Sequence, residues 1–383
     1  MISAELVSDA KALQPLEPQW DDLAIRSRAP YCSPIWMLAW WANLAEDHHA
    51  LRVVVVRDAG KLVGVAPFFA DRYRGLVRYR LLAAPISFPV QPLAAQGHER
   101  SVAESIGGVL AVSDPRPDIV TFDGMPAHRT WPSLLSDTWP KGMHPRVHHM
   151  RALPAPALVL RGRTYEEWLS SKSSNFRQQM RRFRRRLKGK GAKFLLAEGP
   201  EQVERGLTAF IALHHARWEP RGGSNLVHSR PEDMLHTVAA RFADPIRFRL
   251  WLLDVGGRII SVQIFLEAGG ELAYWNGGFD EEWAAERPAL QTIMAAIEHA
   301  FEVGDTRVSL GGGSEDYKYR FADEEDQLDW TSLLPVSPRY PLARLSLLPD
   351  DVRTTVSNHL SDKSKQNLRQ LASKLRSSRG AGA

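Results

Sequence analysis

The amino-acid sequence predicts an α+β protein built from two copies of one unit. Two strand–turn–strand patterns support this class: LRVVVVRDAGKLVGVAPFF begins at Leu51, and FRLWLLDVGGRIISVQIFL begins at Phe248. In each, an apolar strand meets a tight turn that ends in glycine, a cation follows, and a second apolar strand returns, which predicts a β-hairpin. A chain of 383 residues is also long enough for two domains of ordinary size.

The elements around the two hairpins follow one order. A tryptophan-bearing segment of helical spacing precedes each hairpin, SPIWMLAWWANLA in the first half and VERGLTAFIALHHARW in the second. A helix and a short strand follow each: a helix near Ser101–Leu110 before DIVTFDG, and PALQTIMAAIEHAFEVG before TRVSLGGG. We place the junction in the proline-rich stretch MRALPAPALVL and expect domains over residues 1–155 and 156–335, followed by a tail over 336–383.

The tail is predicted to contain a basic amphipathic helix. Leu368, Leu371 and Leu375 recur at helical spacing among basic residues. We expect this helix to pack on the preceding domain or to mediate a homodimer. Contact with a membrane surface or an acidic partner is the alternative.

Composition excludes several classes of protein. The one cysteine, Cys32, excludes an intramolecular disulfide framework, and no apolar run reaches the roughly 18–20 residues that span a bilayer. The sequence start lacks the pattern of a secretory signal, so we expect a cytoplasmic protein with at most peripheral contact with the inner membrane. The net charge of +5 permits an anionic ligand without requiring a polyanion. No metal is expected, because thiolate clusters, an HExxH motif and carboxylate-rich loops are absent from the sequence.

The stretch SLGGGSEDYKYRFAD, residues 309–323, combines a short strand with three glycines, an acidic pair, two tyrosines and two cations. Glycines at a strand end are also typical of loops that bind phosphate. A phosphate loop also needs a helix after the glycines, and YKYRF reads as alternating or irregular instead. We therefore expect no kinase or dehydrogenase chemistry here.

A strongly basic helix is predicted in SSNFRQQMRRFRRRL, with Ser173 or Ser174 as its cap. Its apolar stripe consists of Phe176, Met180, Phe183 and Leu187. The remaining faces carry arginines, which either form a solvated face or include a binding pair. In the second case Arg177 and Arg181, one turn apart near the helix start, contact phosphates or a carboxylate.

Further candidates follow along the second half. His214 and His215 are adjacent, so helical geometry separates them and disfavours a metal site. We interpret both as structural, and a role of His215 as a base is the alternative. Arg217 and Trp218 precede the turn EPRGG and are expected to form a pocket wall.

The next strands and helix also offer ligand contacts. Gln263 is polar in an otherwise apolar strand and therefore needs a partner or a ligand. In ELAYWNGG, Tyr274 and Asn276 alternate with Trp275, which predicts that they share one face. Pro288 stands at the first turn of a long helix, whose free amides can bind an anion such as a pyrophosphate.

The order of these segments resembles a known family. SNFRQQMRRFRRRL, LHHARWEPRGG, VGGRIISVQIFL, AYWNGGFD, a proline-started helix and LGGGSEDYKYRF are similar to the GNAT-type acyltransferases of the cellulose-biosynthesis CelD/BcsL group, relatives of the FemAB peptidyl transferases. The similarity is best over residues 160–325, and CSPIWMLAWW and GKLVGVAPFF extend it into the first half. One departure is the helix start ERPAL, where the family usually has a Ser-Pro-Gly-like turn.

The resemblance implies tandem GNAT-like (acyl-CoA N-acyltransferase) domains, each a mostly antiparallel sheet flanked by helices. We expect the first half to be catalytically silent, because its strand DIVTFDGMPAHRTW offers one glycine and no Tyr-Lys pair. The resemblance implies transfer of an acyl group from acyl-CoA, with acetyl-CoA as the first choice, to an amine or hydroxyl of a small molecule or cell-envelope precursor. Aminoacyl transfer from charged tRNA and a non-enzymatic partner-binding protein with a degenerate fold are the alternatives.

The resemblance also assigns roles to residues. An acid, a tyrosine and a lysine typically follow the glycines in this family, and they correspond here to Asp316, Tyr317 and Lys318. Asp316 would accept a proton, Tyr317 would donate one to the leaving thiolate, and Lys318 would pair with phosphate or polarise the carbonyl. A purely structural ion pair between Asp316 and Lys318 is the alternative. The expected substrate- or CoA-binding residues are Arg177, Arg181, Arg217, Trp218, Gln263, Tyr274, Asn276, Asp280 and Arg287.

Overall fold

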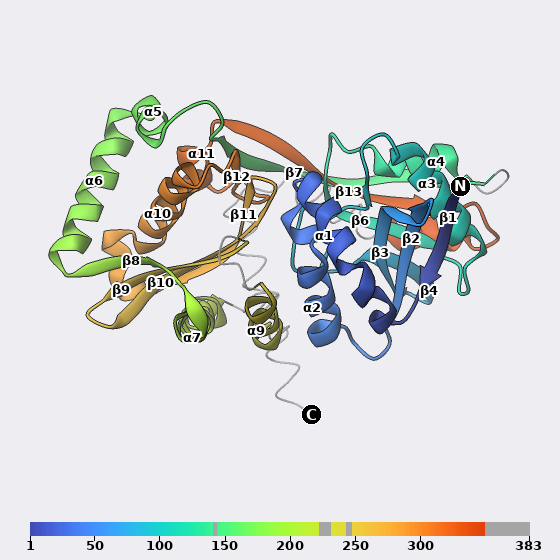
Figure 1. The fold of residues 1–383 in the computed structure, drawn as a ribbon, viewed down its shortest axis with the longest axis horizontal. Helices are drawn as coiled ribbons and strands as arrows, with labels where there is room; N and C mark the ends of the chain where they lie inside the picture. Colours follow the sequence, from blue (N-terminus) through green and yellow to red (C-terminus); the bar gives the residue numbers. More distant parts are fainter. Residues whose placement is uncertain (141–143, 222–230, 243–246, 349–383) are drawn as a thin grey trace.

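The computed structural model describes residues 1–140, 144–221, 231–242 and 247–348 (Figure 1). The strands of these residues join one mixed sheet in the order β1-β2-β3-β4-β6-β13-β7-β12-β11-β10-β9-β8, and β5 pairs with β3. Helices pack against this sheet in both halves. The α+β class predicted from the sequence is confirmed.

The first half of the fold runs from β1 to β7 and lies on the right in Figure 1. Its strands are β1 (Ile2–Val7), β2 (Ala50–Asp58), β3 (Lys61–Tyr73), β4 (Leu76–Leu81), β5 (Leu93–Ala94), β6 (Ile119–Pro126) and β7 (Arg146–Val159). Its α-helices are α1 (Glu17–Arg26), α2 (Pro34–Leu44), α3 (Glu99–Val112) and α4 (Trp131–Thr138). Its 3-10 helices are η1 (Ala10–Leu16) and η2 (Pro30–Cys32).

The second half runs from α5 to β13. Its strands are β8 (Ala192–Leu196), β9 (Phe248–Val255), β10 (Arg258–Ala268), β11 (Glu271–Phe279), β12 (Arg307–Ser309) and β13 (Glu324–Leu334). Its α-helices are α5 (Tyr165–Ser171), α6 (Ser174–Gly189), α7 (Gly199–Trp218), α9 (Glu232–Arg241), α10 (Pro288–Glu302) and α11 (Asp316–Phe321). Its 3-10 helices are η3 (Glu219–Arg221) and η4 (Glu281–Glu286).

The internal repeat is visible in the strand pairing. In the first half β1, β2, β3 and β4 pair antiparallel in sequence, and β4 then pairs parallel with β6. In the second half β8, β9, β10 and β11 pair antiparallel in sequence, and β11 then pairs parallel with β12. The duplication that the sequence predicts is thus confirmed by the topology.

Both predicted hairpins turn through residues with positive φ. The β2–β3 turn uses Ala59 (φ 47°) and Gly60 (φ 81°), and the β9–β10 turn uses Gly256 (φ 60°) and Gly257 (φ 90°). Two consecutive positive φ angles give the turn a twist that matches the twist of the flanking strands. Glycine adopts these angles without steric cost, which is why the sequence pattern predicts the turns well.

The proline-rich stretch in which we place the junction between the halves lies in a strand. The stretch forms β7, which pairs with β12 and, along all of β13, with the last strand of the second half. β13 in turn pairs with β6 of the first half. Each half therefore places its final strand beside the sheet of the other half, and a boundary at residue 155 falls inside a strand.

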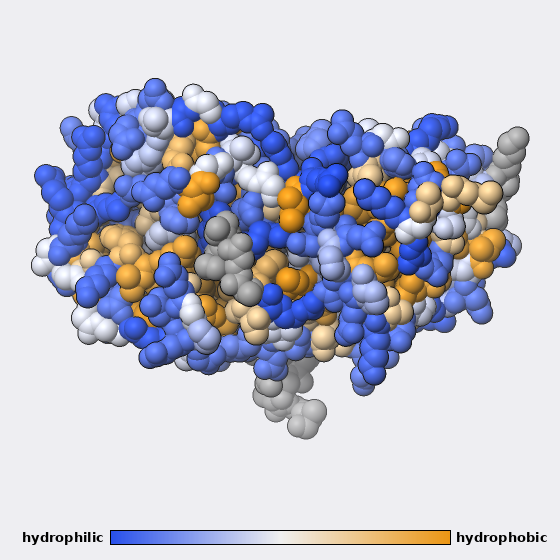
Figure 2. All heavy atoms as spheres, in the orientation of Figure 1, coloured by the Kyte–Doolittle hydropathy of each residue, from blue (hydrophilic) through white to orange (hydrophobic). Residues whose placement is uncertain are grey.

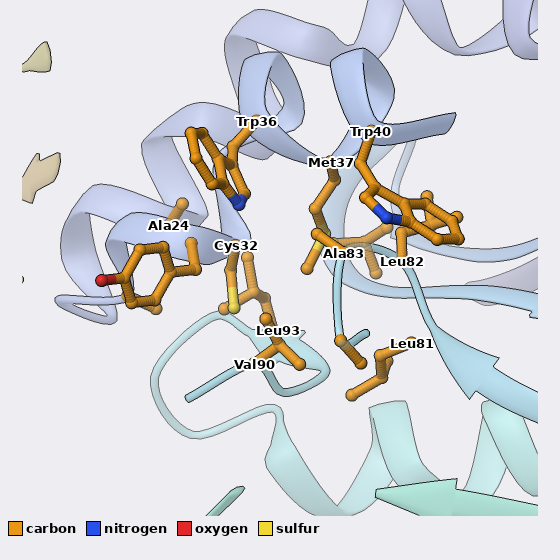
Figure 3. Packing of buried hydrophobic residues seen from close by; sticks show 14 of the residues in the cluster. Ala24, Cys32, Trp36, Met37, Trp40, Leu81, Leu82, Ala83, Val90 and Leu93 are labelled. Carbon is orange, nitrogen blue, oxygen red and sulfur yellow. The ribbon is translucent and has the colours of Figure 1, made fainter. Parts of the chain in front are cut away.

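A hydrophobic core extends through both halves. It includes residues of α2 and β3 from the first half and of α7, α9, β9 and β10 from the second. In Figure 3, Trp36, Met37 and Trp40 project from α2 toward the segments that carry Leu81–Ala83 and Val90–Leu93. Trp36 is fully buried, and its ring meets Trp275 of β11 edge to face with centroids 5.2 Å apart. The indole of Trp275 donates a hydrogen bond to the carbonyl of Ile86 (3.0 Å).

The start of the tail packs on the first half. Residues 340–348 are helical, and Ala343 and Leu347 join a buried cluster with Leu76, Ile119 and Leu334. The predicted amphipathic helix with Leu368, Leu371 and Leu375, and any homodimer that it mediates, lie outside the described residues. No helix among the described residues is long and apolar enough to cross a membrane.

Trp36→Ala should destabilise both halves together, because the core that Trp36 anchors is shared. We expect a loss of about 3–5 kcal/mol in the free energy of unfolding, the usual range for truncating a buried tryptophan. Scanning calorimetry should show a single transition at a lower temperature.

Val112→Ala, at an exposed residue of the same half, serves as the control and should change stability by less than about 0.5 kcal/mol. Two separated transitions, of which Trp36→Ala moves one alone, would mean that the halves have independent cores.

Candidate active site

The candidate site lies where two parallel strands separate. β11 and β12 pair over three residues only, Glu271–Ala273 with Arg307–Ser309. β11 then continues to Phe279, while the chain leaves β12 into the glycine-rich stretch. A pocket of about 460 Å³ lies at this separation. Its volume falls in the range of ordinary small-molecule sites, roughly 300–1,000 Å³.

The pocket brings together seven of the residues predicted from the sequence. These are Arg217, Trp218, Gln263, Tyr274, Asn276, Arg287 and Tyr317. They come from the end of α7, from β10 and β11, from the start of α10 and from α11. Segments distant in the sequence therefore contribute to one cavity.

A β-bulge changes the expected face of Asn276. Tyr274 pairs with Phe265 and Asn276 pairs with Ile264, so Trp275 is an extra residue of β11. An extra residue shifts the alternation of side chains by one position. The prediction that Tyr274 and Asn276 share a face by simple alternation is therefore wrong, although both line the pocket.

Gln263 is part of a buried hydrogen-bonded network. The hydroxyl of Tyr274 donates to Oε1 of Gln263 (3.0 Å), and Nε2 of Gln263 donates to Oγ of Ser261 (3.0 Å). A Cβ on Gly277, in the neighbouring strand, would lie 2.0 Å from Oε1 of Gln263. Burial, followed by the nearby Tyr317, raises the pKa of Tyr274 well above its usual value. Gln263 thus positions the Tyr274 ring within the pocket wall.

The start of α10 forms a cationic, uncapped end of the pocket. Arg287 adopts a left-handed conformation (φ 53°, ψ 53°) and precedes Pro288 at the first helical position. No side chain caps this helix, and its first intrahelical bond runs from the Gln291 amide to the Arg287 carbonyl. The amides of Ala289 and Leu290 therefore have no partner within the helix, which favours an anion at this end.

The stretch after the glycines is helical, contrary to the prediction. Residues Asp316–Phe321 form α11, which starts after Glu315. The helix is stabilised by tertiary contacts that local pattern does not reveal: Phe321 is fully buried, and its ring meets Phe176 of α6 edge to face. The short length of this helix hides its period in the sequence.

Lys318 binds the glycine loop. The side chain is 5% exposed, and Nζ donates to the carbonyls of Gly312 (2.9 Å) and Gly311 (3.4 Å). Nζ also pairs with Oε2 of Glu315 (2.9 Å). The alternative of an ion pair between Asp316 and Lys318 is therefore wrong, because Lys318 pairs with Glu315.

The glycines themselves pack closely against the first half. A Cβ on Gly312 would come within 3.0 Å of the Phe88 ring and 3.1 Å of Leu328. Gly311 and Gly313 adopt positive φ angles of 73° and 125°. The bare backbone thus allows the loop to fold against Phe88, which differs from the expected close approach to a ligand.

Tyr317 and Glu315 are the ionisable side chains of this stretch that line the pocket. Burial, followed by the charge of Glu315, raises the pKa of Tyr317 well above its usual value, so its hydroxyl stays protonated at neutral pH. Glu315 was not among the predicted residues. Its position next to Asp316, the predicted acid, was the only feature of the sequence that could have indicated it. Asp316 is exposed at the start of α11 and is not part of the pocket wall.

Arg177, Arg181 and Asp280 also lie outside the pocket wall. Nη1 of Arg177 donates to the carbonyls of Ser170 (2.6 Å) and Lys172 (2.8 Å), so it holds the end of α5. Arg181 is exposed on α6. Asp280 caps η4 through the Glu282 amide (3.0 Å) and pairs with Arg258. The predicted apolar stripe and the Ser173 cap of α6 are confirmed.

His214 is buried behind the pocket and stays neutral. Its pKa is lowered to about 4 by burial, with opposition from a hydrogen bond to the Gly277 backbone. The side chain is 3% exposed, and its ring stacks near Phe210. The interpretation of this histidine as structural agrees with its burial.

A model of a known protein family matches part of the chain. Residues 174–319 match the family model described as an acetyltransferase (GNAT) domain, and this range contains the whole pocket. The segment therefore carries a GNAT acetyltransferase domain. Among curated proteins, none matches the sequence of this chain.

Solved structures with similar folds cover most of the chain. FemX is 11% identical, with a TM-score of 0.58, and the match covers 89% of this chain and 99% of FemX. A conserved protein of unknown function from Bacteroides thetaiotaomicron is 9% identical, with a TM-score of 0.55, over 87% of this chain and 100% of that one. The C-terminal domain of a candidate lysylphosphatidylglycerol synthetase from Agrobacterium fabrum is 9% identical, with a TM-score of 0.54. The match covers 88% of this chain and 94% of that one. With the repeated topology, these matches confirm the tandem GNAT-like fold.

Gly277→Ala should destabilise the protein, because the new methyl group would overlap the hydrogen-bonded amide of Gln263. Gln263 is 1% exposed and held at both ends, so it cannot move aside freely. We expect a loss of about 1–3 kcal/mol in denaturant unfolding, the usual cost of overpacking.

Gly108→Ala is the matched control, since a Cβ on Gly108 would meet nothing within 4 Å in α3. It should raise stability by up to about 1 kcal/mol, as glycine disfavours helix interiors. If Gly277→Ala were as stable as the wild type, the pocket wall would not be rigid at Gln263.

Proposed function

We propose that this protein is an acyltransferase that uses acyl-CoA, with acetyl-CoA as the first choice of donor, and that the pocket at the β11–β12 separation binds this donor. The observation that carries the proposal is the opening of the sheet directly beside the uncapped start of α10. The GNAT domain match over residues 174–319 supports the same class of reaction. The acceptor is an amine or a hydroxyl, and the resemblance to the CelD/BcsL group favours a small molecule or a cell-envelope precursor.

Two features of the pocket suit an acyl-CoA. The amides of Ala289 and Leu290 and the guanidinium of Arg287 would hold the pyrophosphate, because helix N-termini and arginine both favour phosphate. From Tyr274 onward β11 pairs with no described strand on the β12 side. An unpaired strand edge offers backbone donors and acceptors to an extended, amide-containing chain. The pantetheine arm is such a chain.

The reaction requires little more than positioning and proton transfer. The acceptor nitrogen attacks the thioester carbonyl, the C–N bond forms and the C–S bond breaks. The leaving thiolate takes the phenolic proton of Tyr317, and the tyrosinate then takes the proton that the new amide loses. Tyr317 can donate because burial keeps it protonated. Glu315 would stabilise the positive charge that develops on the attacking nitrogen, and Lys318 would position Glu315 and the glycine loop.

We infer that the first half is catalytically silent. Its matching strand β6 contains Asp123 and Gly124 before its end at Pro126, and Asp123 pairs with Arg80 (2.9 Å). A Cβ on Gly124 would come within 2.7 Å of Phe88 and 3.0 Å of Trp330. Aromatic side chains thus occupy the space beside β6, and this half contributes no counterpart of Tyr317 and Lys318.

Aminoacyl transfer from charged tRNA remains a second candidate because of the exposed face of α6. Arg181, Arg182, Arg185 and Arg186 are exposed and make no ion pair with the described residues. Figure 2 shows hydrophilic surface over the left end of the molecule, where α6 lies in Figure 1. Binding of tRNA through this face would weaken steeply with salt, since several phosphates would be neutralised.

Tyr317→Phe should lower acetyl transfer about 10²-fold or more, because it removes the proposed proton donor and leaves the ring in place. The assay is thiol release from acetyl-CoA with a panel of amines, read beside the melting temperature. Glu315→Gln and Asp316→Asn, assayed together, show which acid acts: we expect the larger loss for Glu315→Gln.

Tyr319→Phe is the matched control on the same helix, since Tyr319 is exposed and contacts only Glu325 through its hydroxyl. Its turnover should stay within about twofold of wild type. Full activity in folded Tyr317→Phe would remove Tyr317 from the mechanism. Stimulation by charged tRNA, with no use of acetyl-CoA, would establish the second candidate instead.

A further inference from the structure

A second cavity lies between the two halves, on the other side of the sheet from the donor pocket. Its volume is about 250 Å³, and it takes Tyr31 and Gln91 from the first half and Ala273 and Ser309 from the second. Ala273 lines this cavity and Tyr274 lines the donor pocket. Consecutive residues of a strand point to opposite faces, so the two cavities approach β11 from opposite sides.

The second cavity reaches the point where β11 and β12 separate. Ala273 and Ser309 form the last pair between these strands, and both line the cavity. A molecule in the second cavity would therefore lie next to the opening in the sheet, and a donor in the proposed pocket would lie on its far side.

One buried polar group faces this cavity without a partner. Gln91 is 5% exposed, and its Oε1 makes no hydrogen bond with any described residue. Tyr31, which is 2% exposed, lines the same cavity. Leaving a buried polar group unpaired costs about 1–3 kcal/mol. An unpaired acceptor at a cavity indicates a ligand that completes its hydrogen bond.

The inner wall of the cavity carries an excess of carboxylates. The guanidinium of Arg307 contacts three acids, Glu271 (2.7 Å), Glu324 (2.6 Å) and Asp326 (2.6 Å). Of these acids, Glu271 and Asp326 line the cavity, so two negative charges face one positive charge in its inner wall, which favours a further cation nearby. Burial, opposed by Arg307, raises the pKa of Glu271. An ammonium group beside Glu271 would stabilise its ionised form against this burial.

The rim of the cavity has the opposite charge. Arg28 and Arg129 line it, both are exposed, and neither forms an ion pair with a described residue. Guanidinium groups bind carboxylates and phosphates through paired hydrogen bonds. The cavity therefore offers carboxylates inside and guanidinium groups outside, which complements a ligand with an amine at one end and an acid at the other.

We propose that this cavity binds the acyl acceptor, and that the acceptor carries a primary amine together with a carboxylate or a phosphate. The amine lies inward, near Tyr31, Gln91 and Glu271, and the acid lies at Arg28 and Arg129. This inference rests on the proposed acyltransferase function and adds the class of substrate. The first half then contributes acceptor recognition, although its own strand end is catalytically silent.

The test compares acceptors that carry both groups with analogues that lack one of them. The probes are the protein amino acids other than proline, together with glucosamine 6-phosphate, which distinguish a carboxylate from a phosphate. Amino-acid amides and glucosamine lack the acid, and propionate and glucose 6-phosphate lack the amine. We expect thiol release from acetyl-CoA with a kcat/KM at least about tenfold higher for a probe with both groups, the scale of one charge-assisted contact.

Variants of the full-length protein assign the effect to the cavity. Arg28→Gln combined with Arg129→Gln should raise the acceptor KM about tenfold or more and leave the KM for acetyl-CoA unchanged. Gln91→Leu should raise the acceptor KM as well, since it removes a hydrogen-bonding group. Arg26→Gln is the control, because Arg26 is exposed, pairs with Asp22 (3.0 Å) and lies outside the cavity.

The outcomes separate this inference from the function on which it rests. The melting temperature with and without acetyl-CoA tests donor binding by itself. If acetyl-CoA binds and is used, but neutral amines serve equally well or the rim variants keep the wild-type acceptor KM, the inference is wrong and the function stands. If acetyl-CoA neither binds nor reacts with any probe, the proposed function is wrong and the inference falls with it.

Discussion

The pairing of β7 with β13 is the interaction on which the rest of the structure depends. Every residue of β13 has a partner in β7, and these two strands are the final strands of the two repeats. Because each joins the sheet of the other half, one sheet runs through the whole molecule. A hinge between two separate domains is therefore absent from the described residues, and the halves hold a fixed relation. The shared core with Trp36 and Trp275 follows from that relation.

The fixed relation explains why first-half residues meet the second-half site. Phe88 fits against Gly312, so the loop that precedes Tyr317 takes its shape from the other repeat. Tyr31 and Gln91 reach the seam beside Ala273 for the same reason. Under the proposals above, the second repeat holds the donor pocket and the first repeat forms a wall for the acceptor. In this account the silent copy contributes to recognition, and the loss of its own site has no cost for catalysis.

Sequence reasoning reached the features that depend on local pattern. The hairpins are signalled by glycines with positive φ, α6 by its apolar stripe, and the start of α10 by Pro288. It failed for features that are determined by contacts between residues distant in the sequence. The bulge at Trp275 depends on how β11 pairs with β10, and α11 depends on the burial of Phe321. Lys318 was predicted beside the correct glycines, but its partner, Glu315, emerges only when the loop is folded. The exchange of β7 and β13 has no local signal at all.

The central claim is that the start of α10, beside the separation of β11 and β12, binds the donor. Calorimetric titration of coenzyme A into three proteins tests it most directly: wild type, Arg287→Ala, and Arg182→Ala, which removes an exposed arginine of α6 outside the pocket. The account predicts that wild type and Arg182→Ala bind coenzyme A alike, and that Arg287→Ala binds at least about tenfold more weakly, as expected for a lost charge-assisted contact. Equal affinities in all three proteins, or a loss confined to Arg182→Ala, would contradict it.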